Sequence, residues 1–543
     1  MEPIWYKSWP EGVPTEIRCP DTTLPEIVKG HARSFPHREA INFYGYSISY
    51  GSFEQLTAAF ADSLLRLGVL KGDRVCLFME NCPQLIISTF AVWRIGGVVV
   101  FANPMYKEEE LVYQLTDSGS ETIILLDMLY PVLHRIRKKT LLKNVIITGY
   151  RDFLPEAPGL PLHPSLDVPR QYFPCTLEML DLLECDGETS TILAANPNDT
   201  ALLQYSAGTT GTPKGAIINH HNILFSTICS ALWLKGENGI HLAVLPLFHV
   251  TGLVHSLIMP LYNGSTIILL ALYDTETVIM AIEKYRCTHW VSVATMNIAV
   301  VNHPDVKRYN LSSLFACVSG GAPISLKIHR EFKEITGASL AEFYGLSETI
   351  SLVTMNPLER PRLGSVGIPV MNTSVKIADL NDPGREVSLG EMGELMVKGP
   401  QVTRGYWMRS EESSCSIKGG WLATGDIVMM DSDGYIYIVG RKKELIKASG
   451  YSVFPGEVER YIREHPAVAE VAVAGIPSLY RGENIKAFVV LKHEYANSIR
   501  ESDIIEWSRT KMASYKYPRK VEFLPDLPVD GSGKIMRHLL PKE

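Results

Sequence analysis

The strongest constraint on the fold is an alternation of helical and strand-like segments along the first part of the chain. Residues 52–68 have the apolar period of a helix, and 73–79 is a short apolar run typical of a strand. A second helical stretch at 83–97 and a strand-like run at 98–103 repeat the order. Such alternation is typical of α/β proteins with a mostly parallel sheet. Further strand-like runs lie at 121–127, 143–149, 264–270, 287–293 and 314–321.

The character of the sequence changes after about residue 365, where short β-rich pieces and turns such as Asp433-Gly434 follow one another. After Arg441 a compact α+β pattern begins. A chain of 543 residues is also longer than one hydrophobic core usually supports. We therefore predict a large domain of layered α/β subdomains plus a β-rich subdomain at 1–440, and a small mobile α+β domain at 441–543.

The net charge and the cysteine content argue against several classes of protein. The formal net charge of −7 argues against a nucleic-acid partner, which a basic surface would normally accompany. Nine scattered cysteines without a CxxC pair disfavour both a disulfide framework and a zinc site, so a reducing, cytoplasmic environment is expected.

The longest apolar stretch, 242–273, is broken by histidines and prolines, so it predicts buried strands and helices rather than a membrane span. The N-terminal segment has no apolar core of signal-peptide length. Peripheral contact with a membrane stays open. So does the choice between a monomer and a homodimer.

A loop rich in glycine and threonine, "YSAGTTGTPKGA" at 205–216, follows the strand-like run 199–206. Glycines let a backbone approach a bulky ligand, and amides, hydroxyls and a lysine suit phosphate. It is not a Walker A loop, because Lys214 follows Pro213 and precedes Gly215. Taken alone, the stretch also fits a flexible surface loop.

Seven further stretches accompany this loop in a particular order. They are "LPLFHVTG" (245–252), "SGGAP" (319–323), "EFYGLSET" (342–349), "GELMVKGPQVTRGYW" (393–407), "GWLATGDI" (420–427), "GYIYIVGRKKELIKASGYSVFPGEVE" (434–459) and "LPVDGSGKIMR" (527–537). Together the eight resemble the adenylate-forming superfamily of acyl-CoA synthetases, luciferases and peptide-synthetase adenylation domains. The resemblance covers nearly the whole chain.

The resemblance implies a two-step reaction that uses Mg²⁺, ATP and coenzyme A. A carboxylate attacks the α-phosphorus of ATP to give acyl-AMP and pyrophosphate, and a thiol then displaces AMP. Because a carboxylate is nucleophilic at neutral pH, the first step needs positioning and charge neutralisation rather than a general base. The implied phosphate-binding residues are Ser206, Gly208, Thr209, Thr210, Gly211, Thr212 and Lys214.

The same resemblance implies a nucleotide site. The adenine wall would be Gly320, Gly321, Ala322 and Pro323. Tyr344 would stack on adenine beside Gly345, Ser347 would contact the α-phosphate, and Glu348 would bind Mg²⁺ together with Thr210. Asp426 and Arg441 would hydrogen-bond the ribose hydroxyls.

Four residues of the C-terminal part receive implied roles. Lys443 stands at the hinge between the two domains, and Lys534 reaches the acyl and α-phosphate oxygens during adenylation. Gly450 lines the pantetheine path, and Lys516 lies near a phosphate anchor for coenzyme A. Taken alone, each lysine also fits a solvated surface position.

The acyl pocket is expected along Phe248, His249, Leu253, Thr349 and Val353. The N-terminal sequence is most similar to medium- and long-chain fatty acyl-CoA synthetases, which implies a ligase of fatty acid metabolism. An aryl-CoA ligase for coumarate- or benzoate-like acids, and an adenylation enzyme that loads a carrier-protein thiol, stay as alternatives. A catalytically inactive sensor of acyl groups or nucleotides is disfavoured, because the chain keeps the polar residues of the implied active site, Lys214, Glu348, Asp426, Arg441 and Lys534.

Overall fold

The computed structural model describes residues 2–184, 196–206, 213–321, 324–448, 451–478, 482–496, 498–529 and 535–541. The chain divides into two compact units. The first consists of Met1–Ser374 with Val397–Leu422, and the second of Val375–Met396 with Ala423–Glu543. The predicted α/β class is confirmed, whereas the boundary expected at 440/441 stays a prediction.

A seven-stranded sheet in the first unit has the order β7-β6-β5-β3-β4-β8-β9. All neighbours are parallel except β9, which is antiparallel to β8. The strands are β3 (Arg74–Phe78), β4 (Val98–Phe101), β5 (Thr122–Leu126), β6 (Asn144–Thr148), β7 (Leu177–Glu178), β8 (Thr200–Ser206) and β9 (Lys214–Asn219). Strands β3, β4, β5 and β6 are almost entirely buried, as expected for a parallel sheet with helices on both faces.

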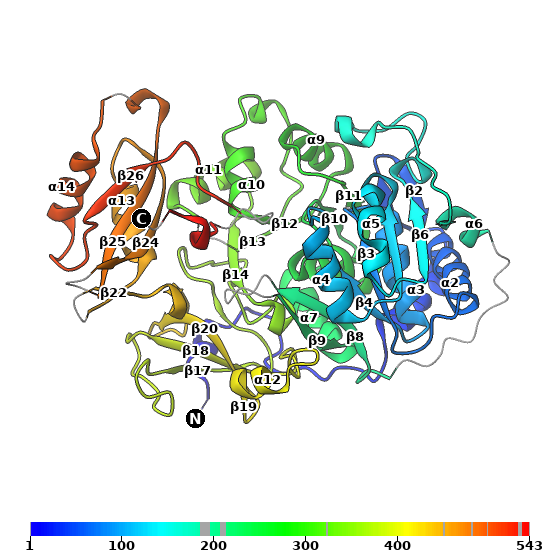
Figure 1. Cartoon of the computed structure of the whole chain (residues 1–543), viewed down its shortest axis with the longest axis horizontal. Helices are drawn as coiled ribbons and strands as arrows, with labels where there is room; N and C mark the ends of the chain where they lie inside the picture. The colour runs from blue at the N-terminus through cyan, green and yellow to red at the C-terminus, as the bar shows by residue number, and fades with distance from the viewer. Residues whose placement is uncertain are drawn as a thin grey trace. The chain divides into compact units, whose positions relative to one another are not determined.

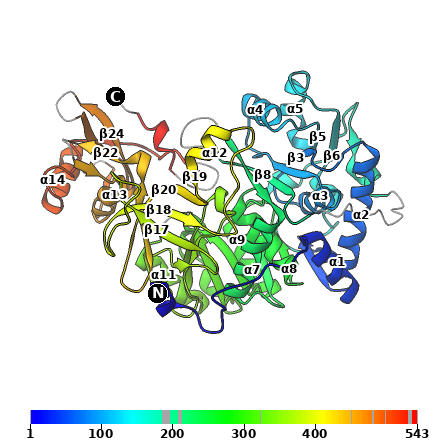
Figure 2. The same cartoon turned by 90° about the horizontal axis from the view of Figure 1, so that it is seen from below.

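Helices α4 and α5 lie on one face of this sheet, and α2 and α3 on the other (Figures 1 and 2). Apolar side chains of α4 and α5 form one core with those of β3, β5 and β6. These helices are α2 (Tyr50–Arg66), α3 (Pro83–Arg94), α4 (Glu108–Ser118) and α5 (Tyr130–Ile136), and the short α6 (Met179–Leu183) follows β7. The helices predicted at 52–68 and 83–97 are thus confirmed as α2 and α3.

A nine-stranded sheet in the same unit has the order β16-β15-β14-β13-β12-β10-β11-β1-β2. The strands are β1 (Glu39–Phe43), β2 (Tyr46–Ser49), β10 (Ile240–Ala243), β11 (Thr266–Leu269), β12 (His289–Val293), β13 (Ala316–Gly320), β14 (Leu340–Tyr344), β15 (Thr354–Met355) and β16 (Ile368–Pro369). The remaining helices of the unit are α1 (Leu24–Ser34), α7 (His220–Leu234), α8 (Met259–Tyr262), α9 (Thr275–Tyr285), α10 (Ala294–Val301), α11 (Leu326–Thr336) and α12 (Ser410–Ser416). Strand β1 pairs with β11, which lies more than two hundred residues later.

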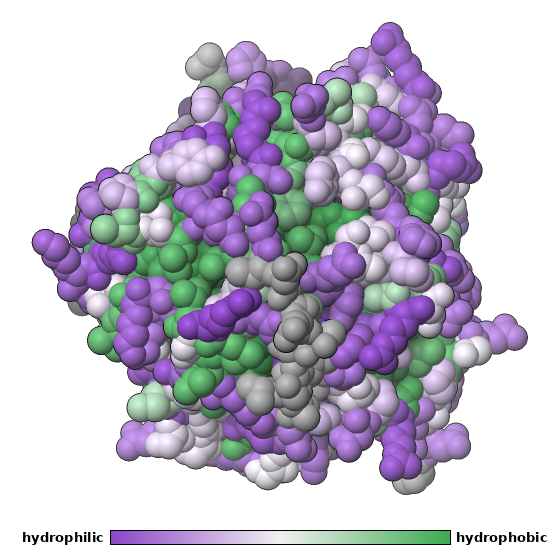
Figure 3. Space-filling model, turned by 90° about the vertical axis from the view of Figure 1, so that its right-hand side faces the viewer, coloured by the Kyte–Doolittle hydropathy of each residue, from purple (hydrophilic) through white to green (hydrophobic). Residues whose placement is uncertain are grey.

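The apolar stretch 242–273 folds as predicted into buried strand and helix, but it contains a π-helix at Gly252–Ile258. A side chain at Gly252 would place its Cβ 2.3 Å from the Pro246 carbonyl oxygen, so the close turn into this helix requires glycine. Within the described part of the chain, no helix is both long and apolar enough to cross a membrane. Figure 3 shows hydrophilic side chains interspersed with apolar areas on one face.

The β-rich segment forms a sheet in the order β17-β18-β20-β19, with β21 paired to β20. Its strands are β17 (Ser374–Ala378), β18 (Gly393–Lys398), β19 (Ile417–Lys418), β20 (Trp421–Met430) and β21 (Ile436–Arg441). The predicted turn at Asp433-Gly434 joins β20 to β21. Gly434 has φ +85°, a conformation that glycine adopts readily.

A second five-stranded sheet follows, in the order β23-β22-β25-β24, with β26 paired to β25. Its strands are β22 (Ile446–Ala448), β23 (Tyr451–Val453), β24 (Val468–Ser478), β25 (Gly482–Leu491) and β26 (Lys520–Phe523), and its helices are α13 (Pro455–Arg463) and α14 (Glu501–Lys511). Apolar side chains of both helices and the sheet share one core.

The cysteines in the described part of the chain form no disulfide bonds with one another. Eight of the nine lie in the described residues, and all eight are free. Burial raises the pKa of the Cys82 thiol to about 12, which keeps it protonated and unreactive at neutral pH. Cys82 is one of five buried cysteines that pack in the core, whereas Cys175 and Cys415 are exposed.

Three buried histidines of the first unit make its stability sensitive to acid. Burial lowers the pKa of His220 to about 4, of His289 to about 4 and of His255 to about 3. Neither ring nitrogen of His220 has a hydrogen-bond partner among the described residues. In the unfolded chain each histidine binds a proton below about pH 6.5, whereas the folded protein excludes that proton until about its lower pKa.

We expect the free energy of unfolding to fall as pH drops from about 6.5 toward 4, by up to about 1.4 kcal/mol per pH unit for each such histidine. His220→Phe should reduce this slope, because it removes one group that takes up a proton on unfolding. Urea unfolding at several pH values measures the effect. His37→Phe, at an exposed position, is the matched control, and equal slopes for the two variants would contradict the assignment.

Candidate functional site

The carboxyl ends of β13 and β14 form one edge of the site. The two strands are parallel neighbours, with Ser319 opposite Glu342, so Gly320 and Tyr344 end adjacent strands. A Cβ at Gly320 would lie 2.8 Å from the Phe343 ring, which explains a residue without a side chain there. Ligands of open α/β sheets bind at such carboxyl ends. Ala322 and Pro323 lie outside the described residues.

The segment after β14 folds back tightly on itself. A Cβ at Gly345 would lie 2.1 Å from the carbonyl carbon and oxygen of Ser351, so only glycine fits. The Leu346 N–H donates to Thr349 Oγ1 at 2.9 Å, and the Ser351 N–H donates to the Leu346 carbonyl at 2.9 Å. We call residues 345–351 the nucleotide loop, after the role that the resemblance implies for Ser347 and Glu348. It presents Ser347 and Glu348 half-buried at its turn.

Tyr406 connects the nucleotide loop to β9. Its hydroxyl donates to Glu348 Oε1 at 2.9 Å, and the Lys214 ammonium lies 5.5 Å from the centroid of its ring. Burial and the nearby Glu348 carboxylate raise the pKa of Tyr406, so its hydroxyl stays a donor. The structure thus brings Lys214 and Glu348, two predicted site residues from distant parts of the sequence, to one side chain.

Sequence reasoning assigned no role to Tyr406. It stands in the stretch "GPQVTRGYW", which contributes to the resemblance. The sequence therefore draws attention to this stretch but does not predict the contacts of Tyr406. The N–H of Trp407 donates to the Gly215 carbonyl at 2.8 Å, and Ala216 forms a β-bridge with Tyr406. This edge pairing fixes the ring beside Lys214.

Lys214 itself is ion-paired with Glu412 of α12. The hydrogen bond from Lys214 lowers the pKa of Glu412. Strands β8 and β9 place Ser206 opposite Lys214, so the predicted phosphate loop connects two antiparallel strands. Its members Gly208, Thr209, Thr210, Gly211 and Thr212 lie outside the described residues.

The predicted acyl-pocket residues lie in two segments that contact one another. Phe248 is half-buried, His249 is exposed, and their ring centroids are 6.1 Å apart. Leu253, Thr349 and Val353 are buried. The two segments are joined where Ser351 Oγ donates to Thr251 Oγ1 at 3.2 Å.

In the second unit, the two residues predicted to bind ribose form a pair. Asp426 on β20 lies opposite Arg441 on β21, and Arg441 Nε contacts Asp426 Oδ1 at 2.6 Å. The Asp426 side chain is only 4% exposed. A buried carboxylate and a guanidinium side by side supply the acceptor and the donor that a ribose diol needs.

Of the residues predicted for the C-terminal part, two can be placed. Lys443 is exposed on a short 3₁₀ turn at Lys442–Glu444. Lys516 Nζ lies 2.6 Å from Glu457 Oε1, and although partial burial acts to lower its pKa, the hydrogen bond to Glu457 raises it. Gly450 and Lys534 lie outside the described residues.

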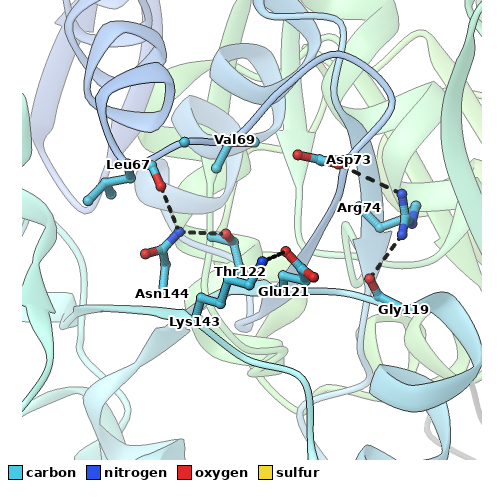
Figure 4. Close-up of a pocket in the computed structure, with 10 residues that line it drawn as sticks. Leu67, Val69, Asp73, Arg74, Gly119, Glu121, Thr122, Lys143 and Asn144 are labelled. Carbon is cyan, nitrogen blue, oxygen red and sulfur yellow. Dashed lines mark hydrogen bonds and ion pairs between the residues drawn. The ribbon is translucent and has the colours of Figure 1, made fainter.

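A cavity of about 220 Å³ lies elsewhere, at the amino ends of β3, β5 and β6 (Figure 4). Its polar groups contact one another: Lys143 lies 2.7 Å from Glu121, and Asn144 donates to Thr122 and to the Leu67 carbonyl. Because these groups are already satisfied and lie at the opposite end of the strands from the usual ligand edge, we assign the cavity no function.

The sequence of this chain matches the family model described as AMP-binding enzyme over residues 28–407, and the model of the AMP-binding enzyme C-terminal domain over 457–534. The chain belongs to the AMP-binding enzyme family. The resemblance to adenylate-forming enzymes inferred from the sequence is thereby confirmed.

Relatives of this enzyme match over its full length. It is 36% identical to a long-chain-fatty-acid–CoA ligase of Bacillus subtilis (strain 168), over 99% of this chain and 98% of the relative. It is similar to the anthranilate CoA ligase AuaEII in complex with anthranoyl-AMP, with TM-score 0.84, 26% identity and coverage of 95% and 96%. ATP-bound MatB from Rhodopseudomonas palustris matches with TM-score 0.83, 27% identity and coverage of 94% and 98%.

The closure of the nucleotide loop on Gly345 predicts that Gly345→Ala displaces Ser351 and weakens AMP binding. We expect a loss of about 1–3 kcal/mol in the free energy of unfolding, typical of overpacking. Calorimetric titration with AMP and chemical unfolding measure the two effects.

Gly30→Ala in helix α1 is the matched control, because a Cβ there meets nothing within 4 Å. It should leave AMP binding unchanged and stabilise the helix by up to about 1 kcal/mol. Wild-type AMP affinity in Gly345→Ala would show that the loop tolerates displacement.

Proposed function

We propose that this enzyme is an ATP-dependent, AMP-forming acyl-CoA ligase that activates a fatty acid. The observation that carries the substrate class is the full-length similarity to a long-chain-fatty-acid–CoA ligase. The geometry supports the nucleotide chemistry, since Lys214 and Glu348 meet at Tyr406 beside the nucleotide loop.

In the proposed adenylation step, the chain's own residues bind and orient the two substrates. Lys214 contacts the β- and γ-phosphates, which leave as pyrophosphate. The hydroxyl of Ser347 donates a hydrogen bond to the α-phosphate. Tyr344 stacks on the adenine, and the Asp426–Arg441 pair binds the ribose hydroxyls. The acid's carboxylate then attacks the α-phosphorus without a general base.

Mg²⁺ is the metal that this chemistry calls for, and Glu348 would hold it. Among the described residues no group of three metal-ligating side chains occurs. A single carboxylate fits Mg²⁺ nonetheless, because this ion is commonly bound by one or two carboxylates together with substrate phosphates and water. When bound, Mg²⁺ neutralises charge on the triphosphate. Thr210 is the second proposed contact, from outside the described residues.

The remaining roles proposed from the resemblance concern coenzyme A and domain movement. Gly450 and Lys516 contact coenzyme A, Lys534 stabilises the adenylation transition state, and Lys443 acts as the hinge. The domain boundary near 440 belongs to this proposal, as do a cytoplasmic location and a monomeric or homodimeric state. Catalysis by the two half-reactions would then use different orientations of the small domain.

Two other substrates remain candidates for the same site. The similarity to an anthranilate CoA ligase supports an aryl acid. The sequence identity to that ligase is 26%, lower than the 36% identity to the fatty-acid relative. A carrier-protein thiol in place of coenzyme A would keep the adenylation step and change only the acceptor. Measuring which acid and which thiol the enzyme consumes distinguishes both alternatives from the fatty acyl-CoA ligase.

Glu348→Gln should lower the rate of acyl-AMP formation by at least about 100-fold, because a neutral amide cannot replace the carboxylate that holds Mg²⁺. ATP–pyrophosphate exchange with a saturating fatty acid is the measurement. The control is Glu359→Gln, which removes a half-exposed carboxylate paired with Lys235. Near-wild-type exchange in folded Glu348→Gln protein would show that Glu348 does not bind Mg²⁺.

A series of straight-chain acids tests the substrate class. Each buried methylene contributes about 0.8 kcal/mol, so kcat/KM should rise with chain length until the pocket ends and then drop. AMP release with coenzyme A present gives the rates. A higher kcat/KM for benzoate, anthranilate or cinnamate than for every straight-chain acid would establish the aryl alternative instead.

A further inference from the structure

A buried chain of polar side chains runs behind the nucleotide loop. His255, in the π-helix Gly252–Ile258, is fully buried. Its Nδ1 lies 3.0 Å from Ser230 Oγ of α7, and its Nε2 lies 3.2 Å from Ser351 Oγ. Ser351 Oγ in turn donates to Thr251 Oγ1 at 3.2 Å. One imidazole therefore connects helix α7, the nucleotide loop and residues 248–253, which we call the acyl-pocket segment.

The direction of these hydrogen bonds follows from the number of protons. The Ser351 hydroxyl has one hydrogen, which it donates to Thr251, so it accepts from His255 Nε2–H. Nδ1 of the neutral ring is then the acceptor for the Ser230 hydroxyl. This assignment of donors and acceptors uses the neutral imidazole. Burial lowers the pKa of His255 to about 3, so this form is present at neutral pH.

The residue that His255 contacts is conformationally strained. Ile350 has φ +42° and Ser351 has φ +73°, the left-handed region that residues with side chains rarely adopt. Such a conformation persists only when surrounding contacts hold it. The Ser351 N–H to the Leu346 carbonyl is one contact, and the bond from His255 is another. These hold the turn on which Ser347 and Glu348 stand.

We propose that His255 is a positioning residue for adenylation, which through Ser351 fixes the nucleotide loop and through Thr251 ties that loop to the acyl-pocket segment. This inference rests on the proposed function, because it assigns Ser347 and Glu348 to the nucleotide. His255 touches no reacting atom in this assignment. It sets the position of Glu348 relative to the segment that includes Phe248 and Leu253.

A second buried histidine offers a matched control. His289 is also buried, its Nε2 lies 3.1 Å from the Leu234 carbonyl, and its Nδ1 lies 2.8 Å from Thr288 Oγ1. Replacement by phenylalanine therefore removes two hydrogen bonds in each case. His289 contacts neither the nucleotide loop nor the acyl-pocket segment in these bonds, so the two variants separate positioning from general packing.

The experiment compares His255→Phe and His289→Phe in two half-reactions of the full-length enzyme, with thermal unfolding recorded for each. For His255→Phe we expect kcat of ATP–pyrophosphate exchange to fall by about 10-fold or more. The rate of thiolysis of supplied acyl-AMP by coenzyme A should stay within about twofold. His289→Phe should lower the unfolding temperature while both half-reactions stay within about twofold.

Ser351→Ala completes the test, because it removes only the hydroxyl that His255 contacts and serves alone if His255→Phe does not fold. Its loss of exchange should match that of His255→Phe, and the double variant should lose no more than either single variant. His255→Gln, which keeps a donor and an acceptor, should recover part of the rate.

Three results would overturn the inference. They are an unchanged exchange rate in Ser351→Ala, equal losses in both half-reactions of His255→Phe, or fully additive losses in the double variant. Failure of the wild-type enzyme to exchange pyrophosphate with any acid would be a different result, since it would reject the proposed function before any variant is compared.

Discussion

The hydrogen bond from the Tyr406 hydroxyl to Glu348 organises the candidate site of the first unit. Tyr406 is fixed by pairing of its own segment with β9, and Glu348 by the fold of the nucleotide loop after β14. The bond therefore joins the two sheets of the unit at the point where Lys214 begins β9. A second link runs through Thr403, whose N–H donates to the Glu348 carbonyl at 2.7 Å and whose hydroxyl donates to the Ile217 carbonyl of β9 at 2.7 Å. A site for a charged ligand needs that fixed spacing, because electrostatic stabilisation depends on groups already in place.

The sequence predicts the local structure of this enzyme well because its elements obey simple periods. The run 52–68 repeats apolar residues as a helix does and becomes Tyr50–Arg66, and the run 199–206 becomes the strand Thr200–Ser206. Gly345 belongs to a stretch identified by resemblance. The physical reason for it, a 2.1 Å approach of its added Cβ to Ser351, needs the folded backbone.

What the sequence could not provide lies in contacts between distant segments. The pairing of β1 with β11 joins segments more than two hundred residues apart, and the periodicity of each segment does not encode its partner. The π-helix at Gly252–Ile258 looks like any apolar helix in sequence. His249 was singled out by its motif, whereas His255, six residues later, has its partners on α7 and in the nucleotide loop. The sequence likewise does not predict the contacts of Tyr406 and Glu412, because a tyrosine or a glutamate does not indicate which distant residue it will contact.

The charges of the predicted ligand-binding residues are already paired within each unit. Lys214 pairs with Glu412, Arg441 with Asp426, and Lys516 with Glu457. A partly buried cation left alone would lose solvation without compensation, so a carboxylate neighbour stabilises the protein in the absence of ligand. If Lys214 binds phosphate as proposed, an incoming phosphate exchanges one anion for another at this lysine rather than adding a new ion pair. Net affinity then comes from the difference between two partners, which favours a multiply charged triphosphate over a single carboxylate. In the proposed reaction the same exchange would ease the release of pyrophosphate, because the Lys214–Glu412 ion pair would form again as the product leaves.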